Sequence, residues 1–169
     1  CPVVFFSFKD TDGLTFESAY GMLCMKLAFA FQDYQFLLDD DAISDDDKGI
    51  FKRILGRTAS MDETKSCFLL LTRMLKIHFK KSAVVILDEY DVPIAKASSN
   101  GYYSQMLDVM RAMMSTTLKD NTSLDFAVVT GCLKIAKESI FTGTNNFVSD
   151  TILSPRLSES FGFTQADVD

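Results

Sequence analysis

Histidine occurs only once in this 169-residue sequence, and positive charge is scarce. The single histidine, His78, falls near the end of an expected helix, where a surface position is usual. This leaves no histidine for a Ser/His/Asp or Cys/His catalytic site. The 17 Lys and Arg residues against 23 Asp and Glu residues give a net charge of −6. Nucleic-acid binding requires a basic face, so this balance disfavours it, a local basic patch excepted.

Closely spaced cysteine pairs and long apolar runs are also absent. No two of the four cysteines form a CxxC pair, which argues against a metal knuckle or a redox motif. We expect reduced, mostly buried thiols in a cytoplasmic protein. No apolar run reaches the roughly 18 residues of a membrane-spanning helix, and no signal peptide is visible. The cysteines are Cys1, Cys24, Cys67 and Cys132.

The composition is that of one soluble globular domain over residues 1–169. Hydrophobic residues make up 47% of the chain, and 15 Phe and 8 Met predict a bulky core. The sequence opens Cys-Pro-Val-Val-Phe-Phe without an initiator Met, and a strand pattern starts at once. We therefore expect this chain to be part of a longer protein.

Hydrophobic periodicity predicts strands that alternate with helices. Such alternation is typical of an α/β fold, a three-layer arrangement in which a parallel sheet has helices on both faces. A capping box at Ser60 and Glu63 predicts the start of one helix. The acidic stretch Asp39–Gly49 is expected to be a solvated connection, since its aspartates lack the spacing of a calcium loop. The expected strands are Pro2–Phe8, Ala83–Leu87 and Asp125–Thr130, and the long helices are Thr15–Leu38 and Tyr102–Leu118.

The strand Ala83–Leu87 ends directly in the carboxylates Asp88 and Glu89. In open parallel α/β sheets, ligands bind at the carboxyl ends of the strands. Four apolar residues before Asp-Glu have the form of a Walker B segment. In such a segment one carboxylate holds Mg²⁺, usually through water, and the other activates the water that attacks a γ-phosphate. The alternative is a strand that simply runs into an acidic surface turn.

The segment VVILDEYDVPI resembles the Walker B region of the AAA-ATPase-like family of bacterial proteins, which often carry a PD-(D/E)XK nuclease-like domain at the C-terminus. Two later segments are also similar, namely the Thr-Gly after the third strand with the S-I-F-x-G-x-N-N element, and the ending FGFTQADV. The resemblance covers nearly the whole chain in order, although the first long helix and the acidic stretch carry no specific motif. The matching residues are Asp88, Glu89, Tyr90, Asp91, Pro93, Ile94, Thr130, Gly131, Ser139, Ile140, Phe141, Gly143, Asn145, Asn146, Gly162, Phe163, Thr164 and Asp167.

The resemblance implies a P-loop NTPase core that binds and hydrolyses ATP with Mg²⁺. Asp88 would be the Mg²⁺ carboxylate and Glu89 the catalytic base, while Thr130 would sit where such enzymes place a γ-phosphate sensor. Asn145 and Asn146 are candidates for a polar contact with the nucleotide, with a turn-shaping role as the alternative. No role for Asp91 follows from its chemistry, and the expectation for it is a cap on the segment before the next helix.

A phosphate-binding loop is missing from the sequence. The Walker A form needs glycine amides that cradle the phosphates and a Lys that reaches them, and no segment here has both. We expect a fragment that lacks the first strand and this loop, with natural loss of the loop as the alternative. The intact protein would then use ATP and Mg²⁺, whereas this chain alone is expected to be inactive and to bind neither.

Three further expectations concern rival functions and partners. A non-enzymatic, NTPase-shaped interaction scaffold would keep the fold without the chemistry. A metal-dependent nuclease would need a D…(D/E)-x-K spacing, which DEYDVPIAK lacks. Loss of the first strand would leave an edge of Asp125–Thr130 unpaired, and we expect self-association through this edge or by exchange of the Thr151–Ser154 region.

Overall fold

A computed structural model of the chain describes residues 1–132, 140 and 148–150. In this part of the chain, three strands form one parallel sheet in the order β1-β2-β3. The strands are β1 (Val3–Ser7), β2 (Ala83–Asp88) and β3 (Leu124–Val129). The helices are α1 (Phe16–Gln32), the 3-10 helix η1 (Gln35–Asp39), α2 (Asp45–Leu55), α3 (Met61–Lys65), α4 (Cys67–Phe79), α5 (Val92–Asn100) and α6 (Tyr103–Leu118).

Strand β2 is the middle strand, and its register places all three strand ends together. Ser7 at the end of β1 is level with Asp88 at the end of β2, and Leu87 is level with Val129 at the end of β3. Parallel strands need long crossover connections, and α1 to α4 form the first crossover while α5 and α6 form the second. The predicted α/β class with a parallel sheet is therefore confirmed.

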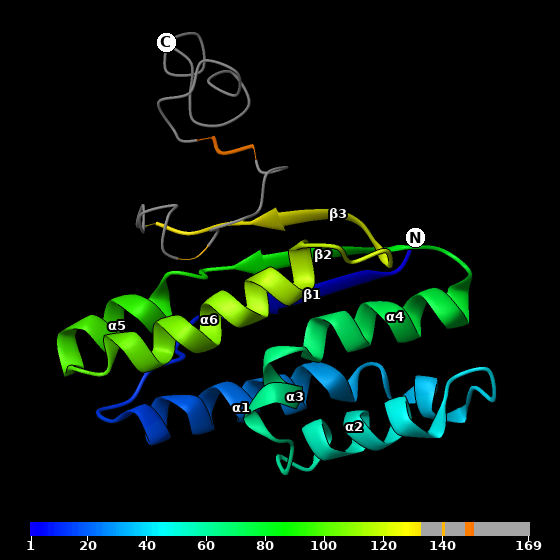
Figure 1. Ribbon diagram of the computed structural model, residues 1–169, viewed down its shortest axis with the longest axis horizontal. Coiled ribbons are helices and arrows are strands. Elements are labelled where there is room, and N and C mark those ends of the chain that lie inside the picture. Colours follow the sequence, from blue (N-terminus) through cyan, green and yellow to red (C-terminus); the bar gives the residue numbers. More distant parts are fainter. Residues whose placement is uncertain (133–139, 141–147, 151–169) are drawn as a thin grey trace, which may run out of the picture.

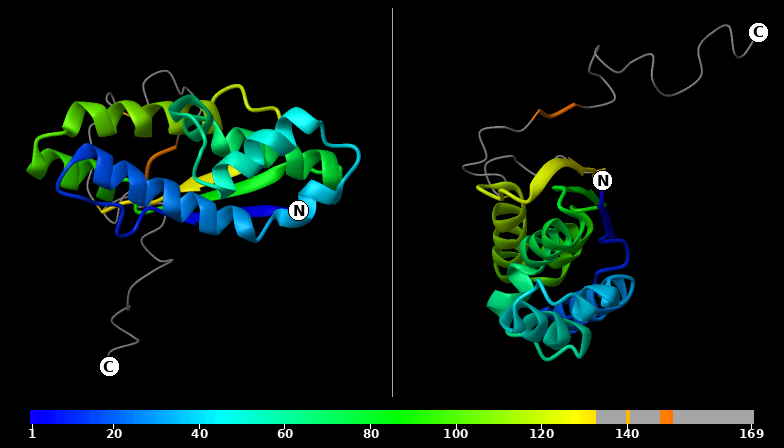
Figure 2. Two further views of the ribbon diagram at one scale, coloured as in Figure 1. Left: turned by 90° about the horizontal axis from the view of Figure 1, so that it is seen from below. Right: turned by 90° about the vertical axis from the view of Figure 1, so that its right-hand side faces the viewer.

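The helices of the described residues all lie on one face of the sheet (Figures 1 and 2). Val4 and Phe6 of β1 are buried beneath them, whereas the alternating residues Val3 and Phe5 point to the other face and are exposed. Phe126 of β3 is 61% exposed and Phe5 is 58% exposed. Strand β1 was expected to be covered on both faces. Within the described residues it has one covered face, and the expected second helical layer is not found there.

Three local expectations about the helices are wrong in their boundaries. The helix expected over Thr15–Leu38 ends at Gln32, and the 3-10 helix η1 follows it. The acidic stretch contains the start of α2, because the Ser44 side chain accepts a hydrogen bond from the Asp47 amide and caps the helix. Acidic side chains in a first helical turn also interact favourably with the helix dipole, so Asp45–Asp47 favour a helix start. The helix predicted to start after Ser60 is divided at Ser66 into α3 and α4.

The expectation about the cysteines is only partly correct. All four are free thiols, but Cys67 alone is buried, while Cys1 and Cys132 are exposed. Burial raises the pKa of the Cys67 thiol far above its ordinary value, so this side chain behaves as a small apolar core residue. Among the described residues, no helix is both long enough and apolar enough to cross a membrane.

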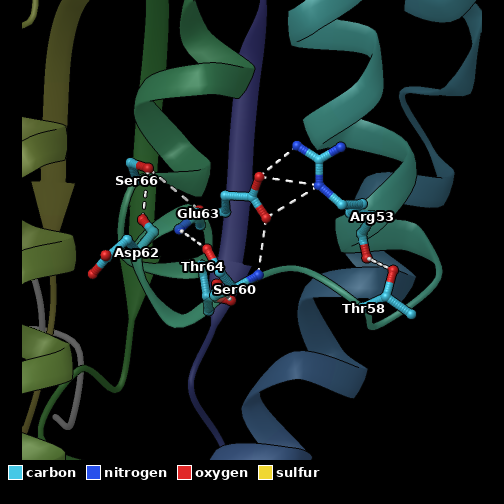
Figure 3. Close-up of polar contacts among 7 residues, drawn as sticks. All are labelled: Arg53, Thr58, Ser60, Asp62, Glu63, Thr64 and Ser66. Carbon is cyan, nitrogen blue, oxygen red and sulfur yellow. Dashed lines mark hydrogen bonds and ion pairs between the residues drawn. The ribbon is translucent and has the colours of Figure 1, made fainter.

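The predicted capping box is present, and it is linked to a neighbouring helix (Figure 3). The Ser60 hydroxyl accepts a hydrogen bond from the Glu63 amide at 3.2 Å, and the Glu63 carboxylate accepts one from the Ser60 amide at 2.9 Å. The guanidinium of Arg53 in α2 donates to the same carboxylate, with its Nη2 2.5 Å from Oε1. This cluster joins α2 to α3.

We predict that Glu63→Gln weakens the dependence of stability on acid pH. The hydrogen bonds from Arg53, followed by the bond from the Ser60 amide, lower the pKa of Glu63 from 4.5 to about 2. A carboxyl group with a lowered pKa in the folded state stabilises the fold above its ordinary pKa, and this contribution is lost as pH falls from 4.5 toward 2. Urea unfolding at several pH values between 6 and 3 should therefore show a smaller loss of unfolding free energy for the variant.

Asp62→Asn is the matched control, because Asp62 lies beside Glu63 and has no ion-pair partner among the described residues. If the unfolding free energy of Glu63→Gln falls as steeply with decreasing pH as that of the wild type, the prediction is contradicted.

Candidate functional site

The candidate site lies at the carboxyl edge of the sheet, where Asp88 ends β2 and Thr130 directly follows β3. The Thr130 hydroxyl donates a hydrogen bond to Oδ1 of Asp88. Two backbone hydrogen bonds hold Thr130 in this place. Its N–H donates to the Leu87 carbonyl at 2.9 Å, and its carbonyl accepts from the Tyr90 N–H at 3.1 Å. Asp88 and Thr130 therefore lie side by side at the end of the central strand.

Glu89 follows Asp88 in an unusual backbone conformation. Its φ is 54°, in the left-handed region that residues with a side chain rarely adopt. This conformation ends the regular alternation of the strand immediately after Asp88. Backbone strain of this kind is common at functional sites, and the catalytic role of Glu89 stays a prediction. Glu89 is partly exposed, and its carboxylate makes no hydrogen bond within the described residues.

Helix α5 begins only three residues after Glu89, at Val92, with Pro93 in its first turn. Proline suits this position because the first helical amides have no partner within the helix. The helix had not been predicted as a separate element. Because α5 begins so soon after β2 ends, one short turn joins the strand to the helix. This turn contains Asp88, Glu89, Tyr90 and Asp91.

Asp91 is the residue of this turn for which the sequence predicts only a cap on the segment before the next helix. It is buried, with 3% of its surface exposed. Its Oδ2 accepts a hydrogen bond from the Cys132 N–H at 3.1 Å, and its carboxyl group packs against Gly131. The only signal in the sequence was the presence of Asp91 in the D-E-Y-D-x-P-I pattern. The contact itself joins residues 41 positions apart.

The remaining predicted site residues, Asn145 and Asn146, lie outside the described residues. Of the S-I-F-x-G-x-N-N element, Ile140 is described, and it is buried in the main core. Ser7, which sequence reasoning did not select, lies level with Asp88 at the same edge.

The described residues fit part of a Mg-nucleotide site. Asp88 is half-buried, and its carboxylate offers an oxygen ligand of the kind that Mg²⁺ binds, directly or through water. Among the described residues no group of three or more His, Cys, Asp or Glu side chains could enclose a metal ion. Mg²⁺ usually binds through one or two carboxylates together with substrate phosphates, so an enclosed metal cage is not required. The sequence has no glycine-rich loop with a Lys for the phosphates themselves.

Fold and site together define a parallel α/β protein whose central strand ends in a pair of acidic residues. A family model described as "Predicted AAA-ATPase" matches residues 1–141. The chain belongs to this AAA-ATPase-like family.

One similar curated protein, from Azotobacter chroococcum mcd 1, is described as an uncharacterized protein in the vnfD 5′ region. It is 30% identical over 121 residues, which cover 71% of this chain and 23% of the relative. The chain thus matches about a quarter of the length of that relative. No solved structure matches the chain significantly.

We predict that Glu89→Gly makes the fold more stable than Glu89→Ala by about 1 kcal/mol. Glycine adopts the left-handed conformation without the steric penalty that a Cβ atom incurs. Urea unfolding at neutral pH measures the difference. Lys80 provides a matched position, because it has a φ of 53° at the end of α4, in another part of the fold. Lys80→Gly should be more stable than Lys80→Ala by a similar amount. Equal stabilities for the two Glu89 variants would show that the residue is not strained.

Proposed function

We propose that this chain is the ATP-hydrolysing core of a longer AAA-like P-loop protein. The observation that carries the proposal is the direct hydrogen bond between Thr130 and Asp88 at the carboxyl edge of the central strand. This edge is where parallel α/β sheets bind their ligands. Family membership supports the same conclusion. The phosphate loop would come from a part of the intact protein that this sequence does not include.

Each residue of the edge has a distinct role in this proposal. Asp88 would hold Mg²⁺, and the ion would neutralise charge on the β- and γ-phosphates. Glu89 would accept a proton from the attacking water, which is general base catalysis. Thr130 would use its hydroxyl to contact the terminal phosphate. Its present bond to Asp88 places this hydroxyl beside the carboxylate that would hold the ion. Asn145 and Asn146 would add polar contacts with the nucleotide.

The proposal predicts that Glu89→Gln in the intact protein lowers the rate of ATP hydrolysis by at least about a hundredfold, because a general base contributes 10²- to 10⁴-fold. ATP affinity should change little, since only the group that activates water is lost. Asp88→Asn should weaken Mg²⁺-dependent nucleotide binding as well. Turnover and nucleotide affinity are measured for both variants.

Glu63→Gln serves as the control for this measurement, because Glu63 joins α2 to α3 and lies away from the carboxyl edge. Unchanged turnover in Glu89→Gln would exclude Glu89 as the base. An intact wild-type protein that binds partners but hydrolyses no ATP would instead support the alternative of a non-enzymatic scaffold.

We also propose that the isolated chain self-associates through the outer edge of β3. Within the described residues β3 pairs with β2 alone, so its other edge presents backbone N–H and C=O groups that can pair with a second copy. The strand carries one charged residue, Asp125, and no proline. The exposed apolar face beside this edge includes Phe126 and Val128. Together they favour a dimer in which a second copy of the chain extends the sheet.

We expect light scattering to give a dimer mass for the isolated chain, and Phe126→Lys to shift it toward the monomer. A lysine on the exposed face opposes association because its charge would lose water in the interface. The matched control is Phe29→Lys, since Phe29 on α1 is exposed to a similar extent, 57% against 61%. A monomeric wild type at high concentration would contradict the proposal.

A further inference from the structure

Asp91 occupies the position before α5 where an acidic residue ordinarily caps a helix, but it does not cap this one. Its side chain makes no capping hydrogen bond to the first turn. The carboxylate is directed across the sheet edge to the chain that leaves β3, where Oδ2 accepts from the Cys132 N–H. Asp91 is only 3% exposed, and an aspartate buried to this extent is rare unless it is paired. The hydrogen bond from the Cys132 N–H is a polar contact that this buried carboxylate needs.

Gly131 makes this approach possible. A Cβ atom at position 131 would lie 2.6 Å from Oδ1 of Asp91 and 2.8 Å from Cε1 of Tyr90. Real Cβ atoms essentially never come within 3.0 Å of a heavy atom outside their own residue and its two chain neighbours. Glycine is the residue that permits such a close approach between a backbone and its neighbour. Asp91 and Gly131 thus form a matched pair, in which a buried acceptor lies against a residue without a side chain.

We propose that Asp91 is a positioning residue that holds Thr130 against Asp88. The proposal rests on the proposed ATPase function, and it gives Asp91 a part in the same site. Hydrogen bonds to Leu87 and Tyr90 fix the backbone of Thr130 on the β2 side. The hydrogen bond from the Cys132 N–H to the Asp91 carboxylate fixes the chain two residues further on. Without it, the segment after β3 could swing away from β2 and carry the Thr130 hydroxyl with it.

The energetic reason for such a clamp is that catalysis is sensitive to small displacements. A misplacement of 1 Å in a catalytic group can lower the rate by about a hundredfold. A hydrogen bond from an amide to a carboxylate is charge-assisted and stronger than one between neutral groups. A buried carboxylate is thus well suited to hold the Cys132 amide in one place.

The test is a double-mutant cycle on the intact protein with Asp91→Ala and Thr130→Val. We expect Asp91→Ala to lower kcat by about ten- to a hundredfold, with little change in the KM for ATP. The double variant should be no slower than the slower single variant, because both changes remove the same interaction. Asp91→Asn keeps an oxygen that can accept from the Cys132 N–H, so it should restore part of kcat. Multiplicative losses in the double variant would overturn the positioning role.

A second measurement separates positioning from a general loss of stability. Hydrogen–deuterium exchange at the Cys132 amide needs no nucleotide, and it should be faster in Asp91→Ala and near the wild-type rate in Asp91→Asn. Asp47→Ala is the matched control, because Asp47 is a buried carboxylate that pairs with Arg73 in the helical layer. This variant should lose stability, with kcat and Cys132 exchange unchanged.

The outcomes distinguish this inference from the proposed function. A wild-type protein without ATP hydrolysis would overturn the proposed function, whatever the exchange data. Normal turnover in Asp91→Ala, or wild-type exchange at Cys132 in that variant, would overturn the positioning role alone. Gly131→Ala gives an independent variant of the same contact. It should accelerate exchange at Cys132, because the new Cβ pushes Asp91 away, and unchanged exchange would count against the clamp.

Discussion

The pairing of β2 between two parallel neighbours is the constraint on which the rest of the structure depends. Its register with β1 and β3 brings three strand ends to one edge of the sheet. Because both neighbours are parallel, the chain must return to the opposite end of the sheet between strands, usually through a helix. This explains why helices separate the strands in the chain. Asp88 and Thr130 meet at this edge only because the strands that carry them are adjacent and parallel.

The same edge contains residues with strained or unusually close backbone geometry. Glu89 has a left-handed backbone conformation, and Gly131 lacks the side chain that would otherwise fill the space beside Asp91. The strain at Glu89 costs of order 1–3 kcal/mol, which the packed sheet and the helical layer must offset. The bulky core under the covered face, which includes Phe6, Phe8 and Phe68 in edge-to-face ring contacts, is where this stabilisation arises.

Much of the architecture could be predicted because it is encoded locally. The strands, the helix Tyr102–Leu118 and the capping box at Ser60 follow from short-range hydrophobic spacing and side-chain caps, and the structure confirms them. The break between α3 and α4 was missed because apolar spacing continues through Ser66. The start of α2 was missed because an acidic run is typical of a solvated loop as well as of a helix N-terminus.

The sequence by itself determined the α/β class, the acidic end of the central strand and the family resemblance, because each depends on residues close together in the chain. Tertiary structure alone decided how distant segments meet. It paired Asp91 with Cys132 across 41 positions, set Gly131 against that carboxylate, and brought the Thr130 hydroxyl to Asp88. It also left Phe5 and Phe126 on an open face among the described residues. Periodicity predicts which residues share a face of a strand, but what covers that face depends on how the elements pack.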